Sequence, residues 1–102
     1  MNVKLAISKL SKIDEIEVVV SARFNKNYLG DKAKLKSITI SDDSIIEVLG
    51  ECGLKIYIPL YDLKEILDYS TSITFLTSNI QILFRWKLPI ETNEGQGGLS
   101  RI

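Results

Sequence analysis

Apolar and polar residues alternate along most of this chain, and a two-residue period is typical of strands with one buried face. The alternation is clearest near the end, where Ile80, Ile82, Phe84 and Trp86 share one face of a strand. Many of the same segments are rich in β-branched residues, which favour strands. Strands are therefore predicted over residues 3–8, 17–24, 35–41, 44–49, 54–59, 72–77 and 80–88.

Two segments show the wider apolar spacing of a helix that buries one stripe. Leu10, Ile13 and Ile16 predict a short helix over residues 9–16. A similar apolar stripe predicts a second helix over residues 60–69. Helices this short depend on packing against the rest of the fold for their stability.

The order of these elements repeats along the chain. The segment 3–7 (VKLAI) matches 54–58 (LKIYI), and each is followed by a predicted helix and two strands. The predicted fold class is α+β: a single small domain of two βαββ-like motifs, about 1–50 and 53–90, related by an approximate internal duplication. Short helices would pack on a mainly antiparallel sheet. The alternative is that two βαββ units arose without duplication, as a common arrangement of such a chain.

The domain is predicted to span residues 1–90. The segment 91–98 contains no apolar residue, so 91–102 is predicted to be a flexible polar tail. At 102 residues with 45% hydrophobic content, the chain suffices for one core and is too short for two ordinary domains.

Thirteen basic and thirteen acidic residues give a net charge of zero. A general nucleic-acid coat or a polybasic membrane binder needs an excess of positive charge, so no membrane partner is expected. The single cysteine forms no intramolecular disulfide, and the start of the chain lacks the apolar run of a signal peptide. A cytoplasmic location is expected.

Several kinds of chemistry are excluded by the residue types. The chain has no histidine and one cysteine, so Ser-His, Cys-His and histidine-ligated metal sites are excluded. Asp62 and Glu65 are interpreted as part of a solvated helix face. We therefore expect a protein that is not an enzyme, with no catalytic residues, no metal and no cofactor.

Binding is the remaining class of function. A seam between two similar motifs, beside an unpaired strand, suits an extended peptide. Tyr57, Tyr61, Tyr69 and Arg85 are the candidate partner-binding residues, because tyrosine and arginine are enriched at interfaces. The leading hypothesis is a protein–protein interaction module for a protein or peptide partner, with a homodimer as one form of such pairing.

A basic cluster supports a second hypothesis, nucleic-acid binding through phosphate contacts. Its members are Arg23, Lys26, Lys32, Lys34 and Lys36. The alternative is that these lysines form a solvated loop and protect a sheet edge.

The isoleucine- and lysine-rich composition, the single cysteine, the size and the paired segments 3–7 and 54–58 also suggest a relationship. In these features the chain resembles small uncharacterised proteins of filamentous viruses of hyperthermophilic crenarchaea. The resemblance implies expression in the host cell cytoplasm and a host or viral protein partner.

Overall fold

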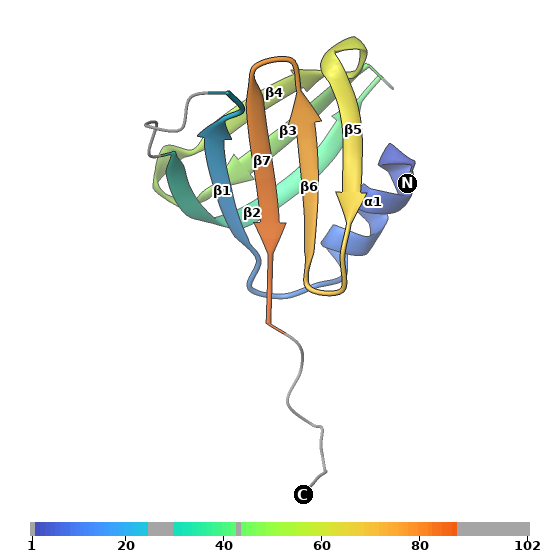
Figure 1. Ribbon diagram of the computed structural model, residues 1–102. Helices are drawn as coiled ribbons and strands as arrows, with labels where there is room; N and C mark the ends of the chain where they lie inside the picture. The colour runs from blue at the N-terminus through green and yellow to red at the C-terminus, as the bar shows by residue number, and fades with distance from the viewer. Residues whose placement is uncertain (1, 25–29, 43, 88–102) are drawn as a thin grey trace, which may run out of the picture.

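The computed structural model describes residues 2–24, 30–42 and 44–87, and the predicted tail 91–102 lies outside them. In the described residues one α-helix precedes seven strands (Figure 1). The elements are α1 (Val3–Ser11), β1 (Glu17–Ala22), β2 (Asp31–Ser41), β3 (Ile45–Gly50), β4 (Lys55–Pro59), β5 (Leu63–Asp68), β6 (Ser72–Thr77) and β7 (Ile80–Arg85). Two short 3₁₀ turns, η1 (Glu51–Gly53) and η2 (Leu60–Asp62), flank β4.

The strands form an antiparallel sheet in the order β4-β3-β2-β1-β7-β6-β5. The sheet is strongly bent: β1, β7, β6 and β5 form the front layer in Figure 1, and β3 and β4 cross behind it. Strand β2 belongs to both layers, because residues 31–34 pair with β1 and residues 35–41 pair with β3. A register shift between Leu35 and Ser37 marks a β-bulge at the bend, as expected where a strand changes direction.

The predicted strand over 3–8 is wrong, because this segment begins α1. Asn2 caps the helix: its side-chain oxygen accepts hydrogen bonds from the main-chain N–H groups of Lys4 and Leu5. Ala6 and Leu10, four residues apart, are buried on one helix face. The helix predicted over 9–16 is therefore displaced towards the N-terminus.

The helix predicted over 60–69 is also wrong. Residues 60–62 form η2, and residues 63–68 form β5, which pairs with β6. A second bulge, between Leu63 and Glu65, breaks the alternation of apolar residues in β5. That irregularity produced an apolar spacing that resembles a helical stripe.

These two corrections overturn the predicted fold class. The segment 3–7 is helical and 54–58 lies mostly in β4, so the two matching segments differ in structure. The chain is not an α+β domain of two βαββ-like motifs, and the duplication hypothesis fails with it. The strands predicted over 44–49, 54–59 and 72–77 are confirmed as β3, β4 and β6.

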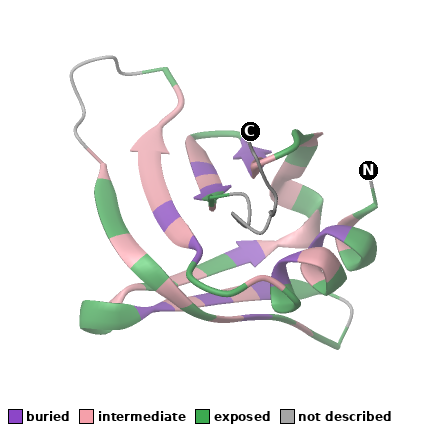
Figure 2. Ribbon diagram, turned by 90° about the horizontal axis from the view of Figure 1, so that it is seen from below, coloured by how far each residue is buried: buried purple, intermediate pink, exposed green. Residues whose placement is uncertain are grey.

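The hydrophobic core lies between the two layers of the bent sheet and α1. Buried positions, purple in Figure 2, recur along α1 and along the strands. Phe75 and Phe84, both fully buried, meet edge to face with their ring centroids 5.1 Å apart. The largest fully buried side chains come from every described strand except β2 and β5, and from α1 and the segment after it: Phe75, Phe84, Leu10, Ile16, Ile46, Ile58, Ile73, Ile82, Val18 and Val48.

Candidate functional site

Within the described residues the bent sheet does not close into a barrel, so β4 and β5 are its two edge strands. An edge strand presents a row of N–H and C=O groups that pair with no strand on that side. The two edges follow one another in sequence, joined only by η2. They are the first places to look for a surface that accepts another polypeptide segment.

The main-chain direction of β4 follows from the two ends of its ladder with β3. The N–H of Gly50 donates to the carbonyl oxygen of Leu54 at 2.9 Å, and the N–H of Leu60 donates to the carbonyl oxygen of Ser44 at 2.9 Å. In an antiparallel ladder, hydrogen-bonded pairs alternate with pairs whose main-chain groups point outward. Every second residue of β4, counted from Leu54, therefore bonds to β3.

That alternation assigns the residues of β4. Ile56 and Ile58, paired with Val48 and Ile46, direct their N–H and C=O groups towards β3. Tyr57 and the residues two positions before and after it direct their main-chain groups away from β3. We call this row, carried by Lys55, Tyr57 and Pro59, the β4 edge.

The other edge is obstructed. Strand β5 contains the bulge between Leu63 and Glu65, which disrupts the regular spacing that a further strand needs. Lys64 and Glu65 are exposed on it. At its far end Asp68 forms an ion pair of 3.1 Å with Lys9 of α1, so the helix lies beside this edge. Bulges and charges are the usual means of preventing strand addition, and β5 carries both.

The side chains around the β4 edge are distributed between two faces. Tyr57 points outward and is 58% exposed, and Tyr61, which follows in η2, is 85% exposed. Ile45, the β3 neighbour of Pro59, is 41% exposed on the same outer face. On the inner face Ile58 is 2% exposed and belongs to the core. The β4 edge thus joins a buried apolar face to an exposed aromatic one.

The four residues predicted to bind a partner fall into two regions. Tyr57 and Tyr61 lie together at β4 and η2. Tyr69 lies in the turn between β5 and β6, where its N–H donates to the carbonyl oxygen of Ser72, the strand neighbour of Arg85. The seam on which the prediction rested does not exist, because it required the duplicated motifs.

Arg85 already has a partner within the chain. Its Nη2 lies 2.5 Å from Oε1 of Glu17, across the β1–β7 ladder. In the same row, Glu17 lies opposite Lys34 of β2. Charges of alternating sign therefore neutralise one another across the outer face of three strands.

The basic cluster is divided by the fold. Arg23 donates from Nη1 to the carbonyl oxygen of Thr77 at 2.8 Å, and its guanidinium carbon lies 5.1 Å from the ring centroid of Phe24. It therefore holds the β6–β7 turn in place. Lys26 lies outside the described residues.

The three remaining members lie along β2. Lys32, Lys34 and Lys36 are all exposed. Lys34 makes an ion pair of 3.5 Å with Glu15, which precedes β1. The positive charge of this strand is thus partly offset by Glu15 and by Glu17 opposite Lys34.

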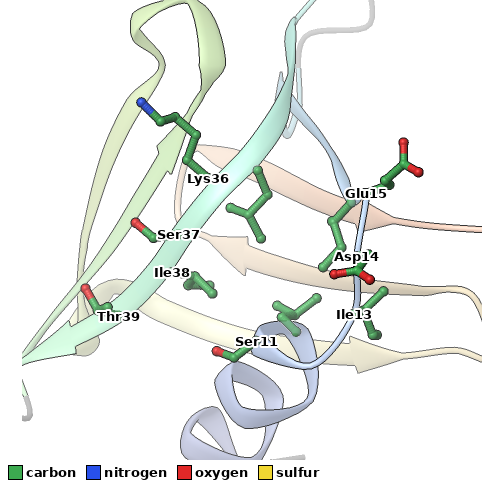
Figure 3. Close-up of a pocket in the computed structure, with 11 residues that line it drawn as sticks. Ser11, Ile13, Asp14, Glu15, Lys36, Ser37, Ile38 and Thr39 are labelled. Carbon is green, nitrogen blue, oxygen red and sulfur yellow. The ribbon is translucent and has the colours of Figure 1, made fainter.

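A hollow of about 450 Å³ lies between the end of α1 and the bulge of β2 (Figure 3). Its apolar lining includes Ile13 and Ile38. Figure 3 shows Lys36, Ser37 and Thr39 on β2, with Asp14 and Glu15 on the segment across from them. In this view the side chain of Lys36 points away from Asp14 and Glu15. The lining residues are Leu10, Ser11, Ile13, Asp14, Glu15, Ile16, Leu35, Lys36, Ser37, Ile38 and Thr39.

A second hollow, of about 680 Å³, is lined by Asp14, Glu15, Glu17, Arg85, Trp86 and Lys87. The ion pair of Glu17 with Arg85 occupies part of its wall. Lys9 lies 5.5 Å from the centroid of the Trp86 ring, on the side of α1. Several of the charged and aromatic groups of this hollow are therefore already engaged within the chain.

Within the described part of the chain, no group of three or more metal-binding side chains is placed to hold an ion. Asp62, predicted on a helix with Glu65, lies instead in η2 and accepts a hydrogen bond from the hydroxyl of Ser78. The same described ranges contain no helix with the length and apolarity that a membrane crossing requires.

Sequence reasoning missed the β4 edge, although a signal for it was present. Lys55 begins this strand and Pro59 ends it, and both residue types are typical of edge strands. Ile45 was also missed, because its exposure depends on the position of β3 near the end of the sheet.

Comparison of the chain with protein-family models, with curated proteins and with solved structures finds no match. The resemblance to proteins of crenarchaeal viruses therefore stays a prediction.

Proposed function

We propose that this chain is a non-enzymatic protein–protein interaction module that binds an extended segment of its partner along the β4 edge. The observation that carries the proposal is the outward direction of the main-chain groups of Lys55 and Tyr57 on a strand that ends the sheet. Strand addition at such an edge derives its affinity from main-chain hydrogen bonds and its specificity from alternate side chains.

The residues of β4 define which segment fits. On the inner face a partner's side chains would meet Ile56 and Ile58, so apolar residues are favoured there. On the outer face they would meet Lys55 and Tyr57, so an acidic residue beside the lysine and an aromatic or β-branched one beside the tyrosine are favoured. The expected partner is a segment of about five residues with alternating apolar and polar character and no proline at its central positions.

The ends of β4 limit the site. Pro59 has no N–H to donate, and η1 and η2 end the strand on either side. A partner segment is therefore confined to one short stretch. Such restriction allows specific pairing without unlimited sheet growth.

A selection of displayed heptapeptides on the wild-type chain tests this function, and the enriched peptides are then measured against Tyr57→Pro. Proline at position 57 removes the outward N–H and leaves the β3–β4 hydrogen bonds intact, which edge strands tolerate. Tyr57→Thr keeps the N–H, and Tyr61→Thr is a matched control outside the strand.

The enriched peptides are expected to bind the wild type and Tyr61→Thr equally. They are expected to bind Tyr57→Thr several-fold more weakly and Tyr57→Pro not at all. Circular dichroism of each variant verifies the fold. Peptides that bind Tyr57→Pro as well as the wild type would exclude the β4 edge, and a selection without enrichment would count against the function itself.

Nucleic-acid binding is the second candidate. It is favoured by one observation: Lys32, Lys34 and Lys36 are exposed at alternate positions of a single strand. A mobility-shift assay at low salt compares the wild type with the triple glutamate variant of these lysines. Binding that the variant loses would support this candidate, and absence of binding to single- and double-stranded DNA and RNA would remove it.

A further inference from the structure

The sequence of β4 is complementary to itself in the antiparallel direction, and this identifies a partner for the β4 edge. We propose that β4 pairs with β4 of a second copy of the chain, around a two-fold axis at Tyr57. The inference rests on the proposed function, because it names the occupant of the same edge. It implies that the two bent sheets join into one continuous sheet across the dimer.

The register follows from the direction of the main-chain groups. With Tyr57 on the axis, the two copies of Tyr57 exchange hydrogen bonds in both directions, because both residues point outward. Lys55 then lies opposite Pro59 of the second copy and donates its N–H to that proline's carbonyl oxygen. All five residues of β4 overlap in this register. Because Pro59 has no N–H, the carbonyl oxygen of Lys55 receives no main-chain hydrogen bond from the second copy and is left to water.

The side chains agree with this register on both faces. On the inner face Ile56 lies opposite Ile58 of the second copy, so the apolar rows of the two cores become continuous. On the outer face the two Tyr57 rings lie side by side, and aromatic cross-strand pairs are stabilising. The two Lys55 side chains are kept apart, each facing a proline. A register that placed Lys55 opposite Lys55 would oppose like charges.

The geometry also limits the assembly to two copies. Each chain has one β4 edge, and the two-fold pairing uses it fully. The other edge carries the bulge between Leu63 and Glu65 and the ion pair of Asp68 with Lys9. Growth of the sheet beyond the dimer is therefore blocked at β5.

Sedimentation velocity on the full chain, over a wide range of concentration, measures the dimer dissociation constant. Charged substitutions of Tyr57, the residue on the two-fold axis, test the proposal. Tyr57→Lys and Tyr57→Glu each place like charges opposite one another, so each alone is expected to raise the dimer dissociation constant roughly tenfold. An equimolar mixture of the two variants places opposite charges on the axis and is expected to recover the dimer. Tyr61→Lys and Tyr61→Glu are the matched controls and are expected to dimerise like the wild type.

Each other outcome counts against the proposal. A wild type that is monomeric at all concentrations would overturn it. A mixture that fails to recover dimer, or Tyr57→Glu that dimerises alone, would overturn this register, since a shift of two residues would place the introduced carboxylate opposite Lys55. The fluorescence of Trp86 verifies that each variant is folded. If the chain is monomeric while selected peptides still need the N–H of Tyr57, the second copy is rejected as the occupant and the proposed function stands. If the chain neither dimerises nor binds any selected peptide, both proposals fail.

Discussion

Tyr57 lies directly opposite Glu47 in the β3–β4 ladder, yet the main-chain N–H and C=O of Tyr57 point away from Glu47. The two side chains share the outer face of the sheet, while the hydrogen-bonding groups of Tyr57 face the open edge. The side chain of Tyr57 has a neighbour on β3, while its main-chain N–H and C=O groups face the open edge. Strand β4 can therefore act as a template for another strand. The following expectations test the fold that places this edge.

The cap of α1 is the first test, because it separates a helix from a strand over residues 3–11. Replacing Asn2 by alanine removes the acceptor for Lys4 and Leu5 and is expected to cost about 1 kcal/mol of unfolding free energy. Asn2→Asp retains an acceptor and is the matched control. Urea denaturation followed by Trp86 fluorescence gives the values. If Asn2→Ala and Asn2→Asp unfold alike, Asn2 does not cap a helix.

Two phenylalanines test the position of the core. Phe84 is fully buried against Phe75, so Phe84→Ala is expected to destabilise the fold by about 3–5 kcal/mol. Phe24 is 78% exposed and contacts Arg23, so Phe24→Ala is expected to cost no more than about 1 kcal/mol.

Thermal and urea unfolding of both variants measure this difference, and Phe84→Leu provides a milder core substitution should the alanine variant fail to fold. Equal losses at positions 84 and 24 would be incompatible with a core between the two layers of the sheet.

Gly30 tests how closely the backbone is packed around β1, and Gly53 in η1 is the comparison position. A Cβ atom on Gly30 would lie 1.3 Å from the carbonyl oxygen of Val20, so Gly30→Ala must displace main chain and is expected to cost at least about 2 kcal/mol. Gly53 has a φ of +80° and open space around its Cβ position. Gly53→Ala is therefore expected to cost only about 1 kcal/mol, through backbone strain alone. The comparison uses the same urea assay, and a Gly30→Ala variant as stable as the wild type would show that β1 and β2 diverge at this point.

The pattern of apolar residues correctly predicted the short apolar strands. It failed where the apolar positions of one segment fit both a strand and a helix. Residues 44–49 and 72–77 are short apolar runs between turn-forming residues, and they became β3 and β6. In residues 3–10, the apolar positions Val3, Ala6, Ile7 and Leu10 fit a helix, while Val3, Leu5 and Ile7 fit a strand. The N-cap at Asn2 and burial of Ala6 and Leu10 against the sheet favour the helix.

The β4 edge was missed for a different reason. The position of β4 at the end of the sheet depends on β1 pairing with β7, a contact between distant parts of the chain. Lys55 and Pro59 carry a local signal of an edge, but the predicted internal duplication, which is wrong, placed the expected binding site at a seam instead. Tyr57 and Tyr61 were named for their chemistry, and the fold supplies a reason for their exposure.

Amide hydrogen exchange at Tyr57 tests the central claim most directly. The measurement uses NMR on the wild type, at a concentration where the chain is monomeric, with and without a peptide enriched in the selection. Strand addition at the β4 edge is expected to slow the exchange of the Lys55 and Tyr57 amides, whose N–H groups point outward, and to leave the Ile66 and Asp68 amides on the β5 edge unchanged. Slowed exchange at Ile66 and Asp68, with Tyr57 unaffected, would contradict the account.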